Sequence, residues 1–262
     1  MAKVLFIGDV MGKPGRRIVR ELLPALRERE QVDFVIANAE NAAGGAGLVQ
    51  KAAEELFGAG VDALTGGNHI FKNIDIFKFI DDEARLVRPA NYPEHPRLRG
   101  EGCALFQLPG GEQLAVINLL GTVLMKELDN PFHCVDRILE ELKTITPNIF
   151  LDFHAEVTSE KMAMGWHLDG RATAVIGTHT HIPTADERLL HQGTAYQTDT
   201  GMSGPYDSVL GVKKEIILEG YLSKLPVRHT LASGEVTLCG ALIEFDPQTG
   251  RASAIQRIRE TE

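Results

Sequence analysis

Short apolar runs that lead into an acidic, amide or imidazole side chain recur along this sequence, and they limit its fold more than any other feature. Each run has the length and apolar content of a buried strand. The runs and the side chains that follow them are Val4–Ile7 with Asp9, Phe34–Ala37 with Glu40 and Asn41, Val61–Leu64 with Asn68 and His69, Asn148–Asp152 with His154, and Thr173–Ile176 with His179 and His181. Helical patterns separate many of these runs. The sequence therefore predicts an α/β fold whose polar side chains gather at the C-terminal ends of its strands.

The last run ends in two histidines, His179 and His181, that stand one residue apart. Extended backbone directs both imidazoles to the same side, which is how a chain presents two neutral nitrogen ligands to a metal. A strand-end loop with two solvated histidines explains this pair equally well when it is considered alone. The other four runs favour the metal site.

Two carboxylates, two amides and three imidazoles make up the predicted set of ligands: Asp9, Glu40, Asn41, Asn68, His154, His179 and His181. Seven donors exceed the four that a structural zinc site needs, and such sites are usually rich in thiolates. The set suits two cations about 3.5–4 Å apart that share one carboxylate. Mixed nitrogen and oxygen ligation favours iron, manganese or zinc over magnesium or calcium.

Length and composition predict one compact domain that spans residues 1–262, because 44% of the side chains are hydrophobic. The net charge of -9 argues against general binding to nucleic acid or to anionic membranes. Three cysteines without a C-x-x-C pair fit a reducing cytoplasm, and the N-terminal run MAKVLFIGDV has the features of neither a signal peptide nor a membrane-spanning helix. A cytoplasmic location is therefore expected, and a homo-oligomer remains open.

The remaining segments predict a second sheet. Leu105–Leu108 and Leu114–Leu119 flank Gly110-Gly111 and form a hairpin, which indicates that this second sheet is the more antiparallel one. Further predicted elements include helices at Arg16–Arg29 and Phe71–Ile80, a glycine-rich turn at Asp199–Tyr206, and two further strands of the second sheet at Lys213–Glu219 and Gly234–Phe245.

Six stretches make the chain resemble the calcineurin-like metallophosphoesterases, and more closely their YmdB-type branch of bacterial phosphodiesterases. They occur in family order and are GDVMGKPGR, NAENAAGG, TGGNHIF, DFHAE, GTHTHIPTAD and TDTGM. Generic members carry D-x-H after the first strand and G-D after the second. This chain has Asp9-Val10-Met11 and Glu40-Asn41 at those places, as in the YmdB branch. Protein-phosphatase substrates are therefore not implied.

The resemblance, which covers essentially the whole chain, implies a four-layer α/β/β/α sandwich with two facing mixed β-sheets. It also implies two metal ions per chain, with iron favoured and manganese or zinc as alternatives. One ion is held by Asp9, Asn41 and His181, the other by Asn68, His154 and His179, and Glu40 bridges them. His69 matches the family's proton donor, although a histidine that caps the next helix is the alternative reading.

The implied function is a metal-dependent phosphodiesterase that acts on small phosphodiesters, in particular 2′,3′-cyclic or 3′,5′-cyclic nucleotides. In this reaction a metal-bridging hydroxide attacks phosphorus in line and His69 protonates the leaving oxygen. The alternatives are a phosphomonoesterase of the same fold and a metal- or nucleotide-binding regulatory protein with little turnover. Five further side chains are candidates for orienting the imidazoles: Asp152, Glu156, Thr178, Thr180 and Asp186.

Overall fold

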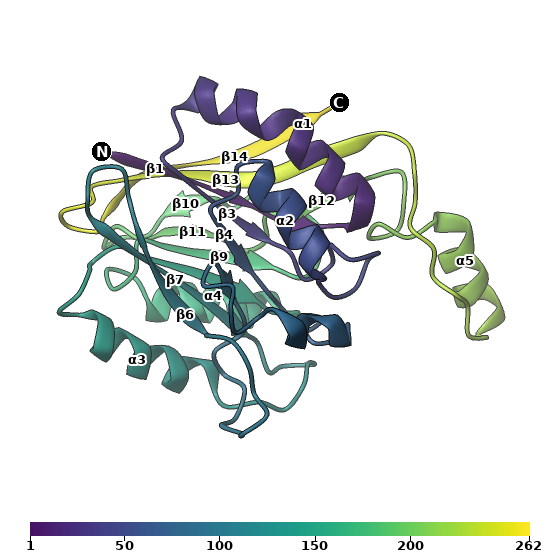
Figure 1. The fold of residues 1–262 in the computed structure, drawn as a ribbon, viewed down its shortest axis with the longest axis horizontal. Helices are drawn as coiled ribbons and strands as arrows, with labels where there is room; N and C mark the ends of the chain where they lie inside the picture. The colour runs from purple at the N-terminus through teal and green to yellow at the C-terminus, as the bar shows by residue number, and fades with distance from the viewer.

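Two β-sheets face each other and carry helices on their outer sides, which gives the four layers α/β/β/α (Figure 1). This computed structural model describes all residues from 1 to 262. The first sheet has the order β2-β12-β13-β1-β3-β4-β5, with β14 paired to β13, and the second has the order β10-β11-β9-β8-β7-β6. The fold class implied by the sequence is therefore confirmed.

The first sheet combines strands from both ends of the chain. Its strands are β1 (Ala2–Ile7), β2 (Asp9–Val10), β3 (Phe34–Asn38), β4 (Ala63–Thr65), β5 (Leu86–Val87), β12 (Met202–Pro205), β13 (Val236–Phe245) and β14 (Ala252–Thr261). β1, β3, β4 and β5 run parallel, whereas β13 pairs antiparallel with β1. Helices α1 (Gly12–Glu30) and α2 (Gln50–Gly58) cover its outer face.

The middle of the chain forms the second sheet. Its strands are β6 (Cys103–Gln107), β7 (Gln113–Leu120), β8 (Ile149–His154), β9 (Ala174–Thr178), β10 (Arg188–Leu189) and β11 (Ala195–Gln197). Its inner strands β7, β8, β9 and β11 are parallel. Helices α3 (Pro131–Leu142) and α4 (Thr158–His167) cover its outer face and make the crossovers that parallel strands need.

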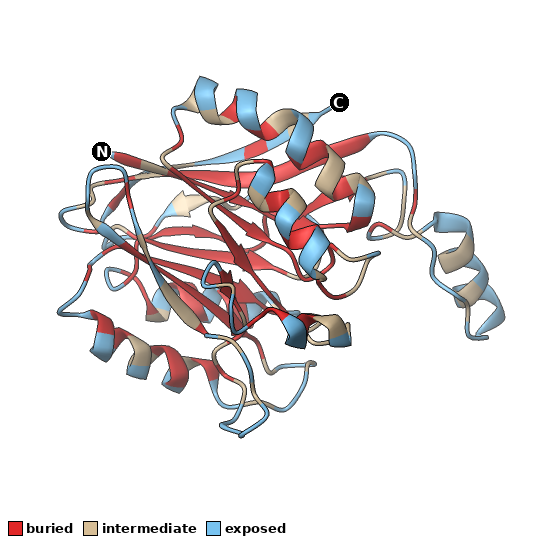
Figure 2. Cartoon of the chain, viewed as in Figure 1, coloured by how far each residue is buried: buried red, intermediate tan, exposed pale blue.

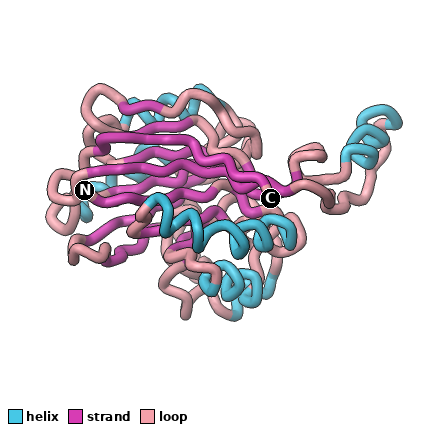
Figure 3. Tube along the Cα trace, turned by 90° about the horizontal axis from the view of Figure 1, so that it is seen from above, coloured by secondary structure: helices cyan, strands magenta, loops and turns pink.

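Three apolar cores join the four layers. Successive residues of a strand point to opposite faces, so each sheet packs one face against the other sheet and one against its helices. Leu5 and Ile7 face α1 and α2, whereas Val4 and Phe6 face the second sheet. The third core lies between the second sheet and helices α3 and α4. Both sheets are buried along most of their length (Figure 2). Helix α5 (Lys214–Ser223) has no buried residue and stands apart from the body (Figure 3).

Several predicted elements were wrong in kind or in place. Lys213–Glu219 lies mostly in α5 and is not a strand, and Phe71–Ile80 contains only the 3-10 helix η1 (Ile74–Lys78). The predicted turn Asp199–Tyr206 contains β12, which pairs with β2. The strand at Gly234–Phe245 exists as β13 but belongs to the first sheet. The second sheet is mainly parallel, and its antiparallel pairs lie at its edges.

None of the helices combines the length with the apolar composition that crossing a bilayer requires.

Candidate metal centre

The structure brings all seven predicted ligand residues to the ends of the strands, in the space between the two sheets. The first sheet contributes four of them, namely Asp9 in β2, Glu40 and Asn41 after β3, and Asn68 after β4. The second sheet contributes three, namely His154 at the end of β8, and His179 and His181 after β9. Contacts shorter than 4 Å connect all seven side chains into one cluster.

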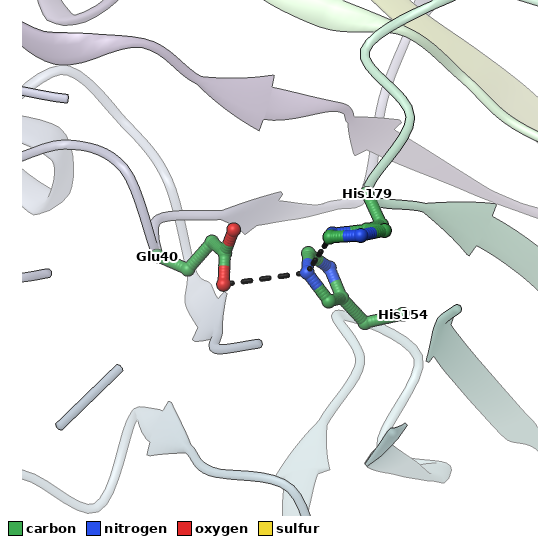
Figure 4. A group of neighbouring side chains, drawn as sticks. All are labelled: Glu40, His154 and His179. Carbon is green, nitrogen blue, oxygen red and sulfur yellow. Dashed lines mark hydrogen bonds and ion pairs between the residues drawn. The ribbon is translucent and has the colours of Figure 1, made fainter. Parts of the chain in front are cut away.

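Three residues lie at the centre of this cluster, with one ligand atom of each within 4.8 Å of the others (Figure 4): Glu40, His154 and His179. His154 Nε2 lies 3.3 Å from Glu40 Oε2 and 3.0 Å from His179 Nδ1. The amide oxygen of Asn68 lies 2.9 Å from the same His154 nitrogen. Two imidazole nitrogens and two side-chain oxygens therefore converge on one small volume, which could hold a metal ion.

The pKa values of Glu40 and His179 leave the His179 imidazole free to act as a ligand. Burial and the neighbouring His154 lower the pKa of His179 to about 3. Burial raises the pKa of the Glu40 carboxyl, but the contacts with His154 and His69 together outweigh this effect and leave the pKa below its ordinary value. Glu40 is therefore an anion at neutral pH, and His179 keeps an unprotonated nitrogen.

Asp9 supplies a second indication of a cation. The Asp9 side chain is completely buried, and its Oδ2 accepts a hydrogen bond from the backbone N–H of His179 at 3.1 Å. Its Oδ1 has no hydrogen-bond partner and lies 3.7 Å from His181 Nε2. An unpaired buried carboxylate oxygen is costly, and burial raises the pKa of Asp9 accordingly. A cation between Asp9 and His181 would satisfy both groups, so the residues fit a metal.

Asn41 connects the centre to His69. Its amide nitrogen donates to Glu40 Oε1 at 2.9 Å and lies 3.1 Å from His181 Nε2. Its amide oxygen lies 2.7 Å from His69 Nδ1. In this arrangement the oxygen faces His69, and the amide must turn over to present its oxygen to a metal held by His181.

His69 stands at the edge of the centre with a quarter of its side chain exposed. Its backbone N–H donates to Glu40 Oε2 at 2.8 Å. Burial lowers the pKa of the imidazole, and the Glu40 carboxylate partly opposes that effect. With Nδ1 held by Asn41, Nε2 is the nitrogen of His69 that remains for another partner.

A buried chain of hydrogen bonds orients His154. Its Nδ1 lies 2.8 Å from Thr178 Oγ1, and that hydroxyl donates to Asp152 Oδ1 at 2.7 Å. Thr65 and Asn38 donate to the other oxygen of Asp152. This arrangement directs His154 Nε2 at Glu40. Sequence reasoning proposed Asp152 and Thr178 as orienting groups but missed Asn38 and Thr65, because their distant positions give no sign of a shared carboxylate.

The loop that carries the two histidines has an unusual backbone. His179 has φ 101° and His181 has φ 65°, values in the left-handed region that non-glycine residues seldom adopt. Between them, Thr180 donates its backbone N–H and its hydroxyl to Asp199 Oδ2 at 3.0 and 2.8 Å. The buried Lys161 ammonium donates to the same oxygen at 2.7 Å. Thr180, Asp199 and Lys161 therefore hold the loop in place.

Lys161 and Asp199 were missed as members of this site. Lys161 lies inside a helix, where a lysine ordinarily faces solvent, and nothing in the sequence separates it from such a residue. Of two other residues expected to orient the imidazoles, one contacts a histidine and one does not. Glu156 Oε2 lies 3.0 Å from His179 Nε2, whereas Asp186 accepts its hydrogen bonds from Thr184 and Thr198.

Comparison with known proteins places the chain among bacterial phosphoesterases. It is 50% identical over 256 residues to the 2′,3′-cyclic-nucleotide 2′-phosphodiesterase of Bacillus subtilis. The matched region covers 98% of this chain and 96% of the relative. A crystal structure described as a novel phosphatase from Mycoplasma pneumoniae is 36% identical and superposes with a TM-score of 0.93, covering 99% of this chain and 93% of that one. A hypothetical protein from Thermus thermophilus is 43% identical, with a TM-score of 0.93 and 99% of both chains covered.

The model of the family described as YmdB-like protein matches residues 5–258. That match includes every strand end that contributes to the centre. The chain belongs to the YmdB-like family.

Proposed function

We propose that this protein is a metal-dependent phosphodiesterase that hydrolyses 2′,3′-cyclic nucleotides. The observation that carries the proposal is the 50% identity, over nearly the whole length of both chains, with the Bacillus subtilis 2′,3′-cyclic-nucleotide 2′-phosphodiesterase. The buried cluster of carboxylates, amides and imidazoles supports it, because it fits cations that bind a phosphoryl group. The name of this relative favours the 2′,3′-cyclic over the 3′,5′-cyclic substrate.

Two metal ions per chain form part of the proposal, with iron preferred over manganese or zinc. Asp9, Asn41 and His181 would hold one ion. Asn68, His154 and His179 would hold the other, and Glu40 would contact both. When bound, such ions polarise the phosphoryl group and provide a nucleophile at neutral pH. We further propose that residues 1–262 act as one domain, since donors from both sheets serve this centre.

His69 is the proposed proton donor to the ribose oxygen that leaves. An alkoxide leaving group needs a proton in the transition state, and imidazole is suited to deliver it near neutral pH. The Asn41 side chain lies beside Nδ1 and orients the ring; once Asn41 turns its oxygen to a metal, its amide N–H would face Nδ1, which leaves the proton on Nε2 for the substrate. The partial exposure of His69 at the edge of the centre supports direct contact with a substrate.

Metal content and turnover together test these assignments. Glu40→Gln and His179→Ala are expected to lose bound metal and activity, because each removes a donor from the three-residue cluster. His69→Ala is expected to keep the metal and to lose about 10²–10⁴-fold in kcat on the cyclic nucleotide. His167→Ala, which changes a histidine of α4 that contacts Asp136, is the control and should change neither quantity.

The leaving group distinguishes an acid from a residue that only shapes the site. His69→Ala should hydrolyse bis-4-nitrophenyl phosphate nearly as well as the wild type, because nitrophenolate leaves without a proton. An equal loss on both substrates would contradict the role of His69 as an acid. Wild-type protein with its full metal content that hydrolyses phosphomonoesters alone, or no phosphoester, would instead favour the monoesterase or the regulatory alternative.

A further inference from the structure

An aromatic pocket begins at Phe71, two residues after His69. Phe71, Phe77 and Tyr92 form its floor, and the Phe71 ring stacks on Phe77 at 5.3 Å and meets Tyr92 edge-on at 5.3 Å. The pocket has a volume of about 520 Å³, within the range of about 300–1,000 Å³ that is usual for small-molecule sites. The other lining residues are Pro93, Glu94, His95, Arg97 and Leu98.

One wall of this pocket follows the strand end that carries Asn68 and His69, and the other is hydrogen-bonded to the strand end beside His154. Phe71 follows His69 by two residues, in a turn where the N–H of Lys72 donates to the carbonyl of His69 at 2.8 Å. On the other wall, Tyr92 follows the buried Asn91. The Asn91 side chain exchanges two hydrogen bonds with the backbone of Leu120, each 2.9 Å long, and Leu120 is the register partner of His154. The pocket is therefore adjacent to the centre.

Two features of the pocket indicate a planar, partly polar ligand. Phe77 is 45% exposed although it stacks on Phe71, which leaves an aromatic ring accessible. The hydroxyl of Tyr92 is buried and has no hydrogen-bond partner, a state that costs free energy unless another group pairs with it. Burial, and next the charge of Glu40, raise the pKa of this hydroxyl. It therefore remains a protonated donor.

We propose that this pocket binds the base of the nucleotide substrate, with the ring against Phe77 and Phe71 and a base nitrogen or carbonyl accepting from Tyr92. The inference rests on the proposed function, because the base is attached to the ribose whose oxygen leaves. If His69 protonates that oxygen, the ribose and its base lie on the side of His69. Phe71 begins the pocket on that side.

Kinetics on substrates with and without a base test the proposal. Because a base that stacks on an aromatic side chain binds more weakly when that ring is removed, Phe77→Ala should lower kcat/KM for adenosine 2′,3′-cyclic phosphate about tenfold, mainly through KM. Tyr92→Phe should produce a smaller loss of the same kind. Both variants should hydrolyse 1-O-methylribose 2′,3′-cyclic phosphate, which lacks the base, as well as the wild type does. Tyr221→Ala removes an exposed aromatic ring from α5 and is the matched control.

Binding of adenosine separates this inference from the proposed function. Ligand-observed NMR should detect adenosine binding to the wild type and a weaker signal with Phe77→Ala, whether or not the protein hydrolyses any diester. If adenosine binds in this way and no diester is cleaved, the proposed function fails and the base site stands. If Phe77→Ala and Tyr92→Phe bind adenosine as the wild type does, or lose activity equally on both diesters, the base site is wrong.

Discussion

The backbone strain at His179 and His181 shows how single residues prepare the centre. Each left-handed non-glycine residue costs about 1–3 kcal/mol, so the loop needs compensating contacts to keep this shape. Asp199 provides them, since one of its oxygens accepts from Thr180 twice and from Lys161 once. Lys161 also donates to the carbonyl of Thr178 at 2.7 Å, directly before the loop. These contacts hold the backbone that carries both imidazoles.

Removing the Thr180 hydroxyl should therefore weaken metal binding. Thr180→Val keeps the shape of the side chain but loses its bond to Asp199, and we expect the affinity for Mn²⁺ to fall about tenfold, as for other groups that orient ligands. Isothermal titration calorimetry measures this affinity directly. Thr180→Ser keeps a hydroxyl and should bind Mn²⁺ with the wild-type affinity.

A control variant separates positioning from a general loss of stability. Thr194 is buried and donates to the carbonyls of Leu168 and Ala172, away from the histidine loop. Thr194→Val should lower the free energy of unfolding by about 1 kcal/mol and leave the affinity for Mn²⁺ unchanged. Equal effects of Thr194→Val and Thr180→Val on that affinity would show that Thr180 has no specific role.

At the scale of elements, the sequence predicts strands well where a buried run ends in a polar side chain. The strands that precede Asp9, Glu40, Asn68, His154 and His179 were predicted within a few residues, because a parallel sheet buried on both faces requires continuous apolar runs, whereas the short strand β2 that contains Asp9 itself was not predicted. This rule also brings the candidate ligands together, since parallel strands place their C-terminal ends at one edge.

Elements without such packing were not predictable in the same way. Lys213–Glu219 alternates like a strand, but α5 buries no residue. No sheet packing acts on this segment, so the helix propensity of its residues determines its structure. β13 was predicted as a strand but assigned to the wrong sheet, because alternation does not specify which neighbour a strand pairs with. The predicted antiparallel character of the second sheet came from the hairpin of β6 and β7, whereas helices α3 and α4 make its inner strands parallel.

The close approach of β9 to Thr198 gives a prediction at this scale. A Cβ atom at Gly177 would lie 1.7 Å from the carbonyl oxygen of Thr198, so neither backbone can avoid it without moving. We expect Gly177→Ala to lower the free energy of unfolding by about 3 kcal/mol, the upper end for overpacking, as measured by urea denaturation. Gly58→Ala, in α2 and with open space around it, should instead stabilise by about 0.5–1 kcal/mol. A similar effect of both substitutions would contradict the close contact.

At the scale of the whole molecule, the centre connects the two sheets. The apolar core between them holds the sheets together along their length, but at the strand ends buried polar groups replace apolar ones. Asp9 and Glu40 come from the first sheet, and His154 and His181 from the second. The buried carboxylates and the unpaired Asp9 Oδ1 weaken this end of the structure unless a cation joins these groups. Metal binding should therefore stabilise the fold as well as enable the reaction.

The midpoint of thermal unfolding measures this effect. A ligand at one hundred times its Kd stabilises the native state by about 2.7 kcal/mol, which for a chain of this size corresponds to roughly 5–10 °C. We expect wild-type protein with Mn²⁺ to unfold at a midpoint higher by that amount than protein treated with EDTA. His69→Ala should keep the whole shift, because His69 is not a proposed ligand. His154→Ala should lose it, since it removes the imidazole in contact with both Glu40 and His179. Equal midpoints with Mn²⁺ and with EDTA would show that the sheets are not joined through a metal.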